Sequence, residues 1–141
     1  MKTTYSVPVS VKGIVFEDDK VWLRYNQRNE WELPGGKMDE GEQPAETCVR
    51  EINEELGLSV ETTALIQTYL YTIHTSPDES KGVLVISYLC TALGRVGGFE
   101  TTWEKGVAQF KKFDIGQISD LVMPDFYKEA IAAAWHRLKR S

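Results

Sequence analysis

Three glutamates, Glu51, Glu54 and Glu55, crowd into the short segment at residues 44–56, directly after Arg50. In a helix, residues three and four apart are neighbours on the surface, so these carboxylates would share one side. Like charges at that spacing repel each other, and a bound divalent cation would remove the repulsion. Mg²⁺ prefers carboxylate oxygen as a ligand. The pattern therefore indicates either a metal site or a plain solvated acidic face.

Arg50 is the cation placed to balance part of this charge. It stands four residues from both Glu46 and Glu54, the spacing of an ion pair on a helix. One guanidinium cannot pair with every carboxylate in the segment, so the spacing alone leaves an excess of negative charge. The helix itself is predicted over residues 44–56.

Helix signals bound this segment at both ends. Pro44 suits a first helical position, Gly57 suits a C-terminal stop, and Gln43 is a weak N-cap. Apolar residues recur at helical spacing and would form one buried stripe: Ala45, Cys48, Val49, Ile52 and Leu56.

The elements around this helix read as strands followed by one more helix. Apolar and β-branched runs predict strands at residues 7–16, 21–25, 58–72, 83–93 and 107–113, with a short broken strand in WELPGG. A final helix is predicted over residues 124–138. Strands in mixed order with helices before and after favour an α/β sandwich.

Size and composition place limits on the function. The chain has 141 residues, which suits one domain over residues 1–141, and its formal net charge is −5. No basic run favours DNA binding, and no apolar run is long enough to span a membrane. The first residues, MKTTYSVPVS, lack the continuous apolar stretch typical of a signal peptide. Cys48 and Cys90 are predicted to be two free, buried thiols. We expect a soluble, cytoplasmic protein.

The acidic segment is part of a longer spacing pattern. Gly36 is followed after five residues by Glu42, and after seven more by Arg50, Glu51 and Ile52. Glu54, Glu55, Gly57 and Leu58 complete the pattern. This resembles the signature of the Nudix hydrolases, GX5EX7REUXEEXGU with U a bulky aliphatic residue. The preceding WELPGG and the predicted order of strands and helices resemble that family as well.

The resemblance implies a Nudix fold, an α/β/α sandwich with a central mixed β-sheet, and a MutT-like pyrophosphohydrolase activity. Such enzymes use Mg²⁺, with Mn²⁺ as a substitute, to cleave a nucleoside diphosphate linked to another group by attack of water at phosphorus. The metal ligands implied are Glu51, Glu54, Glu55 and the backbone carbonyl of Gly35. Arg50 would orient the carboxylates, and the general base would be Glu51 or a carboxylate on a later loop.

The substrate side of the site is less defined by sequence. Arg24, Arg28 and Lys37 flank the predicted site and are expected to meet phosphates, and Trp103 is expected to stack on a base. Each could equally be an ordinary surface or core residue. Many relatives carry a further carboxylate before the late strand, and Glu104 is the nearest residue here that could serve. The substrate stays open between a (d)NTP and a nucleotide sugar such as ADP-ribose.

Three other functions remain open from sequence. A Nudix-fold isomerase acting on isopentenyl diphosphate would share the fold, and a nucleotide-sensing Nudix domain would bind without cleaving. A structural domain with a solvated acidic helix would show no effect of Mg²⁺ on its melting temperature. A homodimer is compatible with the chain but is not indicated by it.

Overall fold

The computed structural model describes residues 4–76, 79–97, 102–103, 106–107 and 109–140, and for residues 73–76, 79–80, 102–103 and 106–107 it describes the backbone alone. The helices are α1 (Pro44–Leu56) and α2 (Asp125–Arg140), and a 3₁₀ helix, η1, covers Ile115–Asp120. The strands are β1 (Val9–Glu17), β2 (Lys20–Tyr25), β3 (Trp31–Glu32), β4 (Gly35–Lys37), β5 (Leu58–Ser76), β6 (Glu79–Arg95), β7 (Thr102–Trp103), β8 (Gly106–Val107) and β9 (Gln109–Asp114).

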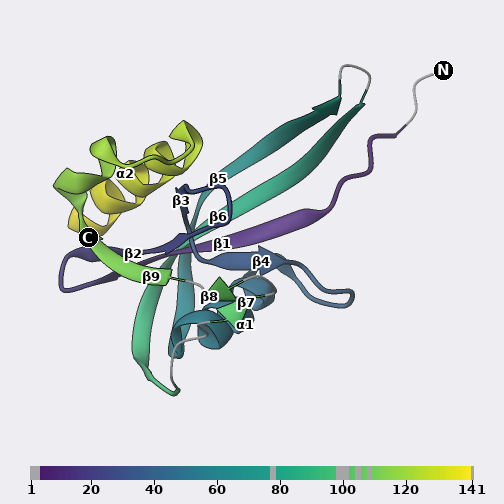
Figure 1. Cartoon of the computed structure of the whole chain (residues 1–141). Coiled ribbons are helices and arrows are strands. Elements are labelled where there is room, and N and C mark those ends of the chain that lie inside the picture. Colours follow the sequence, from purple (N-terminus) through teal and green to yellow (C-terminus); the bar gives the residue numbers. More distant parts are fainter. Residues whose placement is uncertain (1–3, 77–78, 98–101, 104–105, 108, 141) are drawn as a thin grey trace.

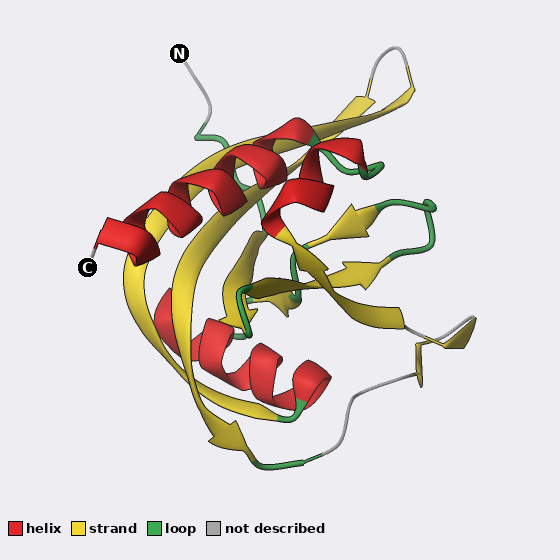
Figure 2. Cartoon of the chain, turned by 90° about the vertical axis from the view of Figure 1, so that its left-hand side faces the viewer, coloured by secondary structure: helices red, strands yellow, loops and turns green. Residues whose placement is uncertain are grey.

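A seven-stranded mixed sheet forms the centre of the fold. Its main order is β3-β2-β1-β6-β5, with β4 also paired to β1 and β9 paired to β2. The β1–β6 pair is parallel and its neighbours are antiparallel. Figures 1 and 2 show α1 and α2 packed on opposite sides of the sheet. The expected α/β/α sandwich with a mixed central sheet is therefore confirmed.

Strand β1 separates two hydrophobic cores, because successive side chains of a strand point to opposite faces. Val11 and Val15 belong to the core under α1, together with Cys48 and Ile52. Ile14 belongs to the core under α2. The apolar run that predicted this strand is thus buried on both faces, as expected for a strand in a helix-covered sheet.

The predicted bounds of α1 are confirmed. Pro44 is its first residue, and Gly57 adopts the left-handed conformation (φ 66°) while its N–H donates to Asn53 O at 2.9 Å. Glu46 strengthens the start of the helix by accepting from the Gln43 backbone N–H at 2.7 Å. The predicted apolar stripe is buried at Cys48, Ile52 and Leu56, whereas Val49 is exposed.

Several other elements depart from the predicted bounds. Strands β5 and β6 extend well beyond residues 58–72 and 83–93, because they pair with each other as one long antiparallel hairpin. The predicted strand at 107–113 is divided between β8 and β9. Helix α2 begins after Pro124, whose carbonyl accepts from the Tyr127 N–H at 3.1 Å. Within the described residues, no helix is long and apolar enough to cross a membrane.

The two cysteines are free and buried, as predicted, and they touch each other. Cys48 on α1 and Cys90 on β6 place their Sγ atoms 3.5 Å apart in the core under α1. The contact with Cys90, together with burial, raises the pKa of the Cys48 thiol well above its usual range. Both thiols therefore serve as packing groups that join α1 to the sheet.

Candidate active site

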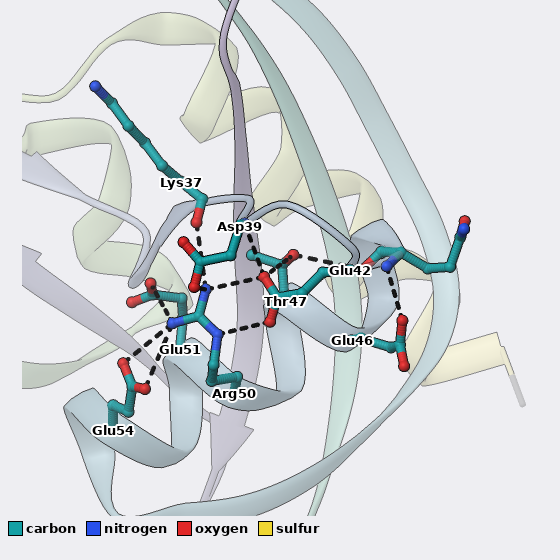
Figure 3. A network of polar contacts seen from close by, with 9 residues as sticks. Lys37, Asp39, Glu42, Glu46, Thr47, Arg50, Glu51 and Glu54 are labelled. Carbon is teal, nitrogen blue, oxygen red and sulfur yellow. Dashed lines mark hydrogen bonds and ion pairs between the residues drawn. The ribbon is translucent and has the colours of Figure 1, made fainter.

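Arg50 organises the acidic side of α1. Its Nε donates to Glu42 Oε2 at 2.7 Å, and its Nη1 donates to Glu51 Oε1 at 3.0 Å. The same Nη1 lies 3.3 Å from Glu54 Oε2, and Nη2 lies 3.2 Å from Asp39 Oδ2. Figure 3 shows the guanidinium among these carboxylates. A planar fork with five N–H donors is suited to holding several carboxylates at once.

Arg50 also fixes the loop that precedes α1. Its Nη2 donates to the backbone carbonyl of Lys37 at 3.3 Å, which ties the end of β4 to the helix. Glu42 accepts from Arg50 and also from the Thr47 hydroxyl and the Asp39 N–H, both at 2.9 Å. The loop between β4 and α1 is thus bound to the helix by charge-assisted hydrogen bonds.

The expected pairing of Arg50 with Glu54 is present, and the pairing with Glu46 is replaced. Glu46 is engaged with the helix N-terminus through the Gln43 N–H. In its place, Arg50 uses Glu42 and Asp39 from the preceding loop. Helical spacing cannot predict these two ion pairs, because they depend on how the preceding loop folds back onto the helix.

Glu55 faces a different partner from Glu51 and Glu54. Its Oε1 accepts from the Gly35 backbone N–H at 2.8 Å. Gly35 opens β4, which pairs with β1 so that Gly35 lies opposite Lys12. Glu55 therefore links helix α1 to strand β4, and through β4 to the central sheet.

Gly36 lies against the Glu51 carboxylate. A Cβ built on Gly36 would stand 2.7 Å and 2.8 Å from the two carboxylate oxygens of Glu51, closer than real Cβ atoms come. Only glycine leaves room for Glu51 in this position. The glycines before α1 thus give the carboxylates close access to the backbone of β4.

Burial and charge set different protonation behaviour for Glu42, Glu51 and Glu55. Burial raises the pKa of Glu55 to about 7, although the positive charge of Lys12 opposes the rise. Burial also raises the pKa of Glu51, against the opposing effect of Arg50. The hydrogen bond from Arg50 lowers the pKa of Glu42 to about 2. Glu54 is more exposed than Glu51: 54% of the Glu54 side chain is accessible, against 17% for Glu51.

The donor set suits a hard divalent cation, but the carboxylates are not gathered around one point. Glu51 and Glu54 turn toward Arg50, whereas Glu55 turns toward Gly35. No group of three His, Cys, Asp or Glu side chains in the described part of the chain is assembled for a metal ion. The chemistry fits Mg²⁺, which takes carboxylate oxygen and keeps several waters. Binding would require rotation of these side chains on a fixed backbone.

A pocket of about 180 Å³ lies at the end of β4, where Lys37 contributes to its lining. Strand β4 joins the two regions: Gly35 and Gly36 contact Glu55 and Glu51, and Lys37 lines the pocket. The pocket combines cations, one carboxylate and aromatic rings. Its lining includes Lys12, Arg28, Glu32, Lys37, Tyr71, Phe126 and Tyr127.

A comparison with known protein families identifies the family of this chain. The NUDIX domain family matches residues 7–134, which is nearly the whole chain. The chain belongs to the NUDIX domain family. The resemblance to this family is therefore confirmed. The residues that match its signature are Gly36, Glu42, Arg50, Glu51, Glu54 and Glu55.

Individual relatives agree with this assignment. An ADP-ribose pyrophosphatase of Methanocaldococcus jannaschii is 36% identical over 94 residues, covering 64% of this chain and 52% of the relative. An 8-oxo-dGTP diphosphatase of Proteus vulgaris is 40% identical over 48 residues, covering 34% and 40%. The chain thus spans about half the length, or less, of these curated relatives. A NUDIX hydrolase structure from Nitrosomonas europaea aligns with a TM-score of 0.74 at 19% identity, covering 94% and 90%, and supports the Nudix fold.

The three cations predicted to bind phosphate have different surroundings in the structure. Arg24 is held by Glu32, with Nη1 2.8 Å from Oε1. Arg28 and Lys37 both line the pocket, and the Lys37 side chain extends away from Arg50 in Figure 3. Trp103 lies in β7 but its side chain is outside the described part, and Glu104 lies outside the described residues altogether. The proposed stacking residue and fourth carboxylate of this Nudix domain therefore stay predictions.

Sequence reasoning missed the inner wall of the pocket. Lys12, Glu32 and Tyr127 come from β1, β3 and α2, and the topology brings them together there. The available signal was a lysine in the middle of the apolar run VSVKGIVF, because a charged residue in a strand buried on both faces needs a reason. Tyr127 carried no such signal, since an aromatic residue on a helix is ordinary core.

Proposed function

We propose that this chain is a metal-dependent hydrolase that cleaves the diphosphate linkage of a nucleotide by attack of water at phosphorus. The observation that carries the proposal is the position of β4. One side of it meets the Glu51 and Glu55 carboxylates, and Lys37 at its end lines a pocket with cations and aromatic rings. A diphosphate laid across β4 would have its charge near the carboxylate-held metal and its nucleoside in the pocket.

The residues proposed to hold the metal are Glu51, Glu54, Glu55 and the carbonyl of Gly35. When bound, Mg²⁺ or Mn²⁺ would neutralise charge on the diphosphate and activate water. Arg50 positions Glu51 and Glu54 through Nη1, so it acts as a support for the ligands. Glu51, largely buried and beside Gly36, is proposed as the general base.

The substrate is proposed to be a small nucleotide, either a (d)NTP or a nucleotide sugar. The pyrophosphatase and diphosphatase names of the relatives support this class. The aromatic and cationic lining of the pocket supports it as well, because bases stack on aromatic rings and phosphates pair with Arg and Lys. The proposed activity fits a protein working in the cytoplasm, where such nucleotides are abundant.

A panel of nucleoside triphosphates and nucleotide sugars, incubated with Mg²⁺ and analysed by chromatography, tests the proposal. Glu54→Gln and Glu55→Gln should each lower turnover by about a hundredfold or more while the fold survives. Glu46→Gln is the matched control on the same helix, since glutamine can still accept the Gln43 N–H. Wild-type turnover in either site variant, or no Mg²⁺-dependent product from any nucleotide, would refute the proposal.

A further inference from the structure

Lys12 is the buried cation that the proposed reaction does not use. It lies on β1 between Val11 and Gly13, and only 7% of the residue is exposed. Its side chain lines the pocket under α2. Burial disfavours its charged form, but the acidic groups around it, with Glu32 foremost, together outweigh burial and raise the pKa of Lys12 overall. The pocket therefore contains a fixed positive charge.

No residue in the described part of the chain accepts a hydrogen bond from the Lys12 ammonium or forms an ion pair with it. Glu32 has the largest electrostatic effect of any acidic group on Lys12, yet the Glu32 oxygens already have other partners. Oε1 lies 2.8 Å from Arg24, and Oε2 lies 3.2 Å from Asn26 and 3.7 Å from Arg28. An ammonium carries three donors and no acceptor, so Lys12 requires acceptor atoms from elsewhere. A buried charge without hydrogen bonds is costly, which makes this requirement strong.

Two further polar groups lie unpaired beside Lys12 on the same face of the sheet. Strand register places Lys12 opposite Ser87 on β6, and Ser87 opposite Gln67 on β5. Residues directly opposite each other in a sheet point to the same face. Ser87 Oγ and Gln67 Oε1 are buried and have no hydrogen-bond partner among the described residues. Lys12, Ser87 and Gln67 thus form a row of polar side chains on the face of the sheet that α2 covers.

The remaining walls indicate which part of a nucleotide enters. Val83, Val85, Tyr71 and Phe126 line the pocket with apolar and aromatic surface. Its volume of about 180 Å³ is below the roughly 300–1,000 Å³ of pockets that enclose whole drug-sized ligands. Lys37 and Arg28 are its more exposed cations and suit phosphates. A nucleotide would therefore place its flat base inside the pocket, against the apolar and aromatic side chains, and its phosphates toward β4, near the exposed cations.

We propose that the Lys12 ammonium donates to a carbonyl oxygen of the nucleobase, so that the pocket favours guanine, cytosine or uracil over adenine. This rests on the proposed function, because it takes the ligand to be a nucleotide. Adenine carries no oxygen and presents an amino donor next to its ring nitrogens, which would face the ammonium. Guanine offers O6 and N7 side by side, an arrangement that lysine contacts well. A site built to donate to an oxygen discriminates against a ligand that lacks it.

Equilibrium binding of GMP, UMP and AMP without added metal tests the inference independently of catalysis. The wild-type chain should bind GMP about tenfold or more tightly than AMP. Lys12→Met should remove that preference, and Lys12→Gln should shift it toward AMP, because glutamine can both donate to and accept from adenine. Lys37→Met is the matched control: it should weaken all three ligands alike and leave their ratios unchanged.

Equal binding of GMP and AMP by the wild-type chain would overturn the inference. Equal weakening of all three nucleotides by Lys12→Met would overturn it too, since that result assigns Lys12 to the phosphate. Retention of the wild-type melting temperature shows that each variant is folded, and Lys12→Gln replaces Lys12→Met if the latter unfolds. Failure of the proposed hydrolase would look different: no nucleotide would be cleaved with Mg²⁺, whereas the base preference in binding would persist.

Discussion

Gly36→Ala tests whether the position of the Glu51 carboxylate governs turnover. Gly36 is not in the left-handed region, so its backbone accepts alanine, and the three atoms nearest to the added methyl group all belong to the end of the Glu51 side chain. The nearest contact would be 2.6 Å to Glu51 Cδ, whereas ordinary van der Waals contact begins at 3.4 Å. The carboxylate must therefore move by about 0.8 Å, the difference between these distances.

A displacement near 1 Å at a reacting group can cost on the order of a hundredfold in rate. We expect Gly36→Ala to lower kcat/KM by about that factor. Because the clash is with a flexible side chain, the free energy of unfolding should change by no more than about 1 kcal/mol. The variant thus separates the position of the carboxylate from the stability of the fold.

The assay compares Mg²⁺-dependent turnover and thermal melting of Gly36→Ala with those of Gly94→Ala. Gly94 lies in β6, and a Cβ added there would meet nothing within 4 Å, so its substitution should leave both readouts at the wild-type level. Wild-type turnover in Gly36→Ala would refute the role given to Glu51. A large fall in melting temperature would refute the claim that the clash is confined to a side chain.

Further predictions follow from the same geometry. Gly35→Ala should unfold or strongly destabilise the chain in thermal melting, because its φ is 144° and the new Cβ would collide with the backbone carbonyl of Val11. Arg50→Lys should lower turnover about 10- to 100-fold with the fold retained, since one ammonium cannot bridge the carboxylates held by the fork. Burial raises the pKa of Glu55 from 4.5 to about 7, so Mn²⁺ affinity measured by titration should weaken as the pH falls below 7. Without metal, that shift should make the free energy of unfolding fall as the pH rises from 4.5 to 7, because the unfolded chain releases this proton first. Cys48→Ala should lower stability by about 1 kcal/mol and leave kcat unchanged, and a selective loss of rate would contradict its packing role.

Local signals in the sequence predicted helix α1 well. Pro44, Gly57 and the apolar spacing define a helix whose ends are set by its own residues, and the predicted bounds of α1 were right. Val49 departed from the stripe because periodicity describes a face of a helix and not how far the neighbouring sheet extends. The ion pairs of Arg50 were half predicted, since Glu54 is local to the helix and Glu42 and Asp39 belong to a loop.

The pocket could not be predicted from sequence because its lining is assembled by topology. Lys12 and Phe126 stand at opposite ends of the chain and meet only after β1 has paired in the sheet and α2 has covered it. The lengths of β5 and β6 were underestimated for the same reason: pairing extended both strands past their apolar runs. The orientation of Glu55 toward Gly35 likewise depends on the pairing of β4 with β1.

The parallel pairing of β1 with β6 has a consequence for how the molecule assembles on the ribosome. Strand β1 is synthesised before its parallel partner β6, which follows only after α1 and the whole of β5. Contacts between segments so distant in sequence form slowly. The β5–β6 hairpin, in contrast, pairs strands that are adjacent in sequence and can form early. Until β6 has been synthesised, β1 lacks its parallel neighbour, so its apolar side chains and unpaired edge stay exposed to aggregation during synthesis.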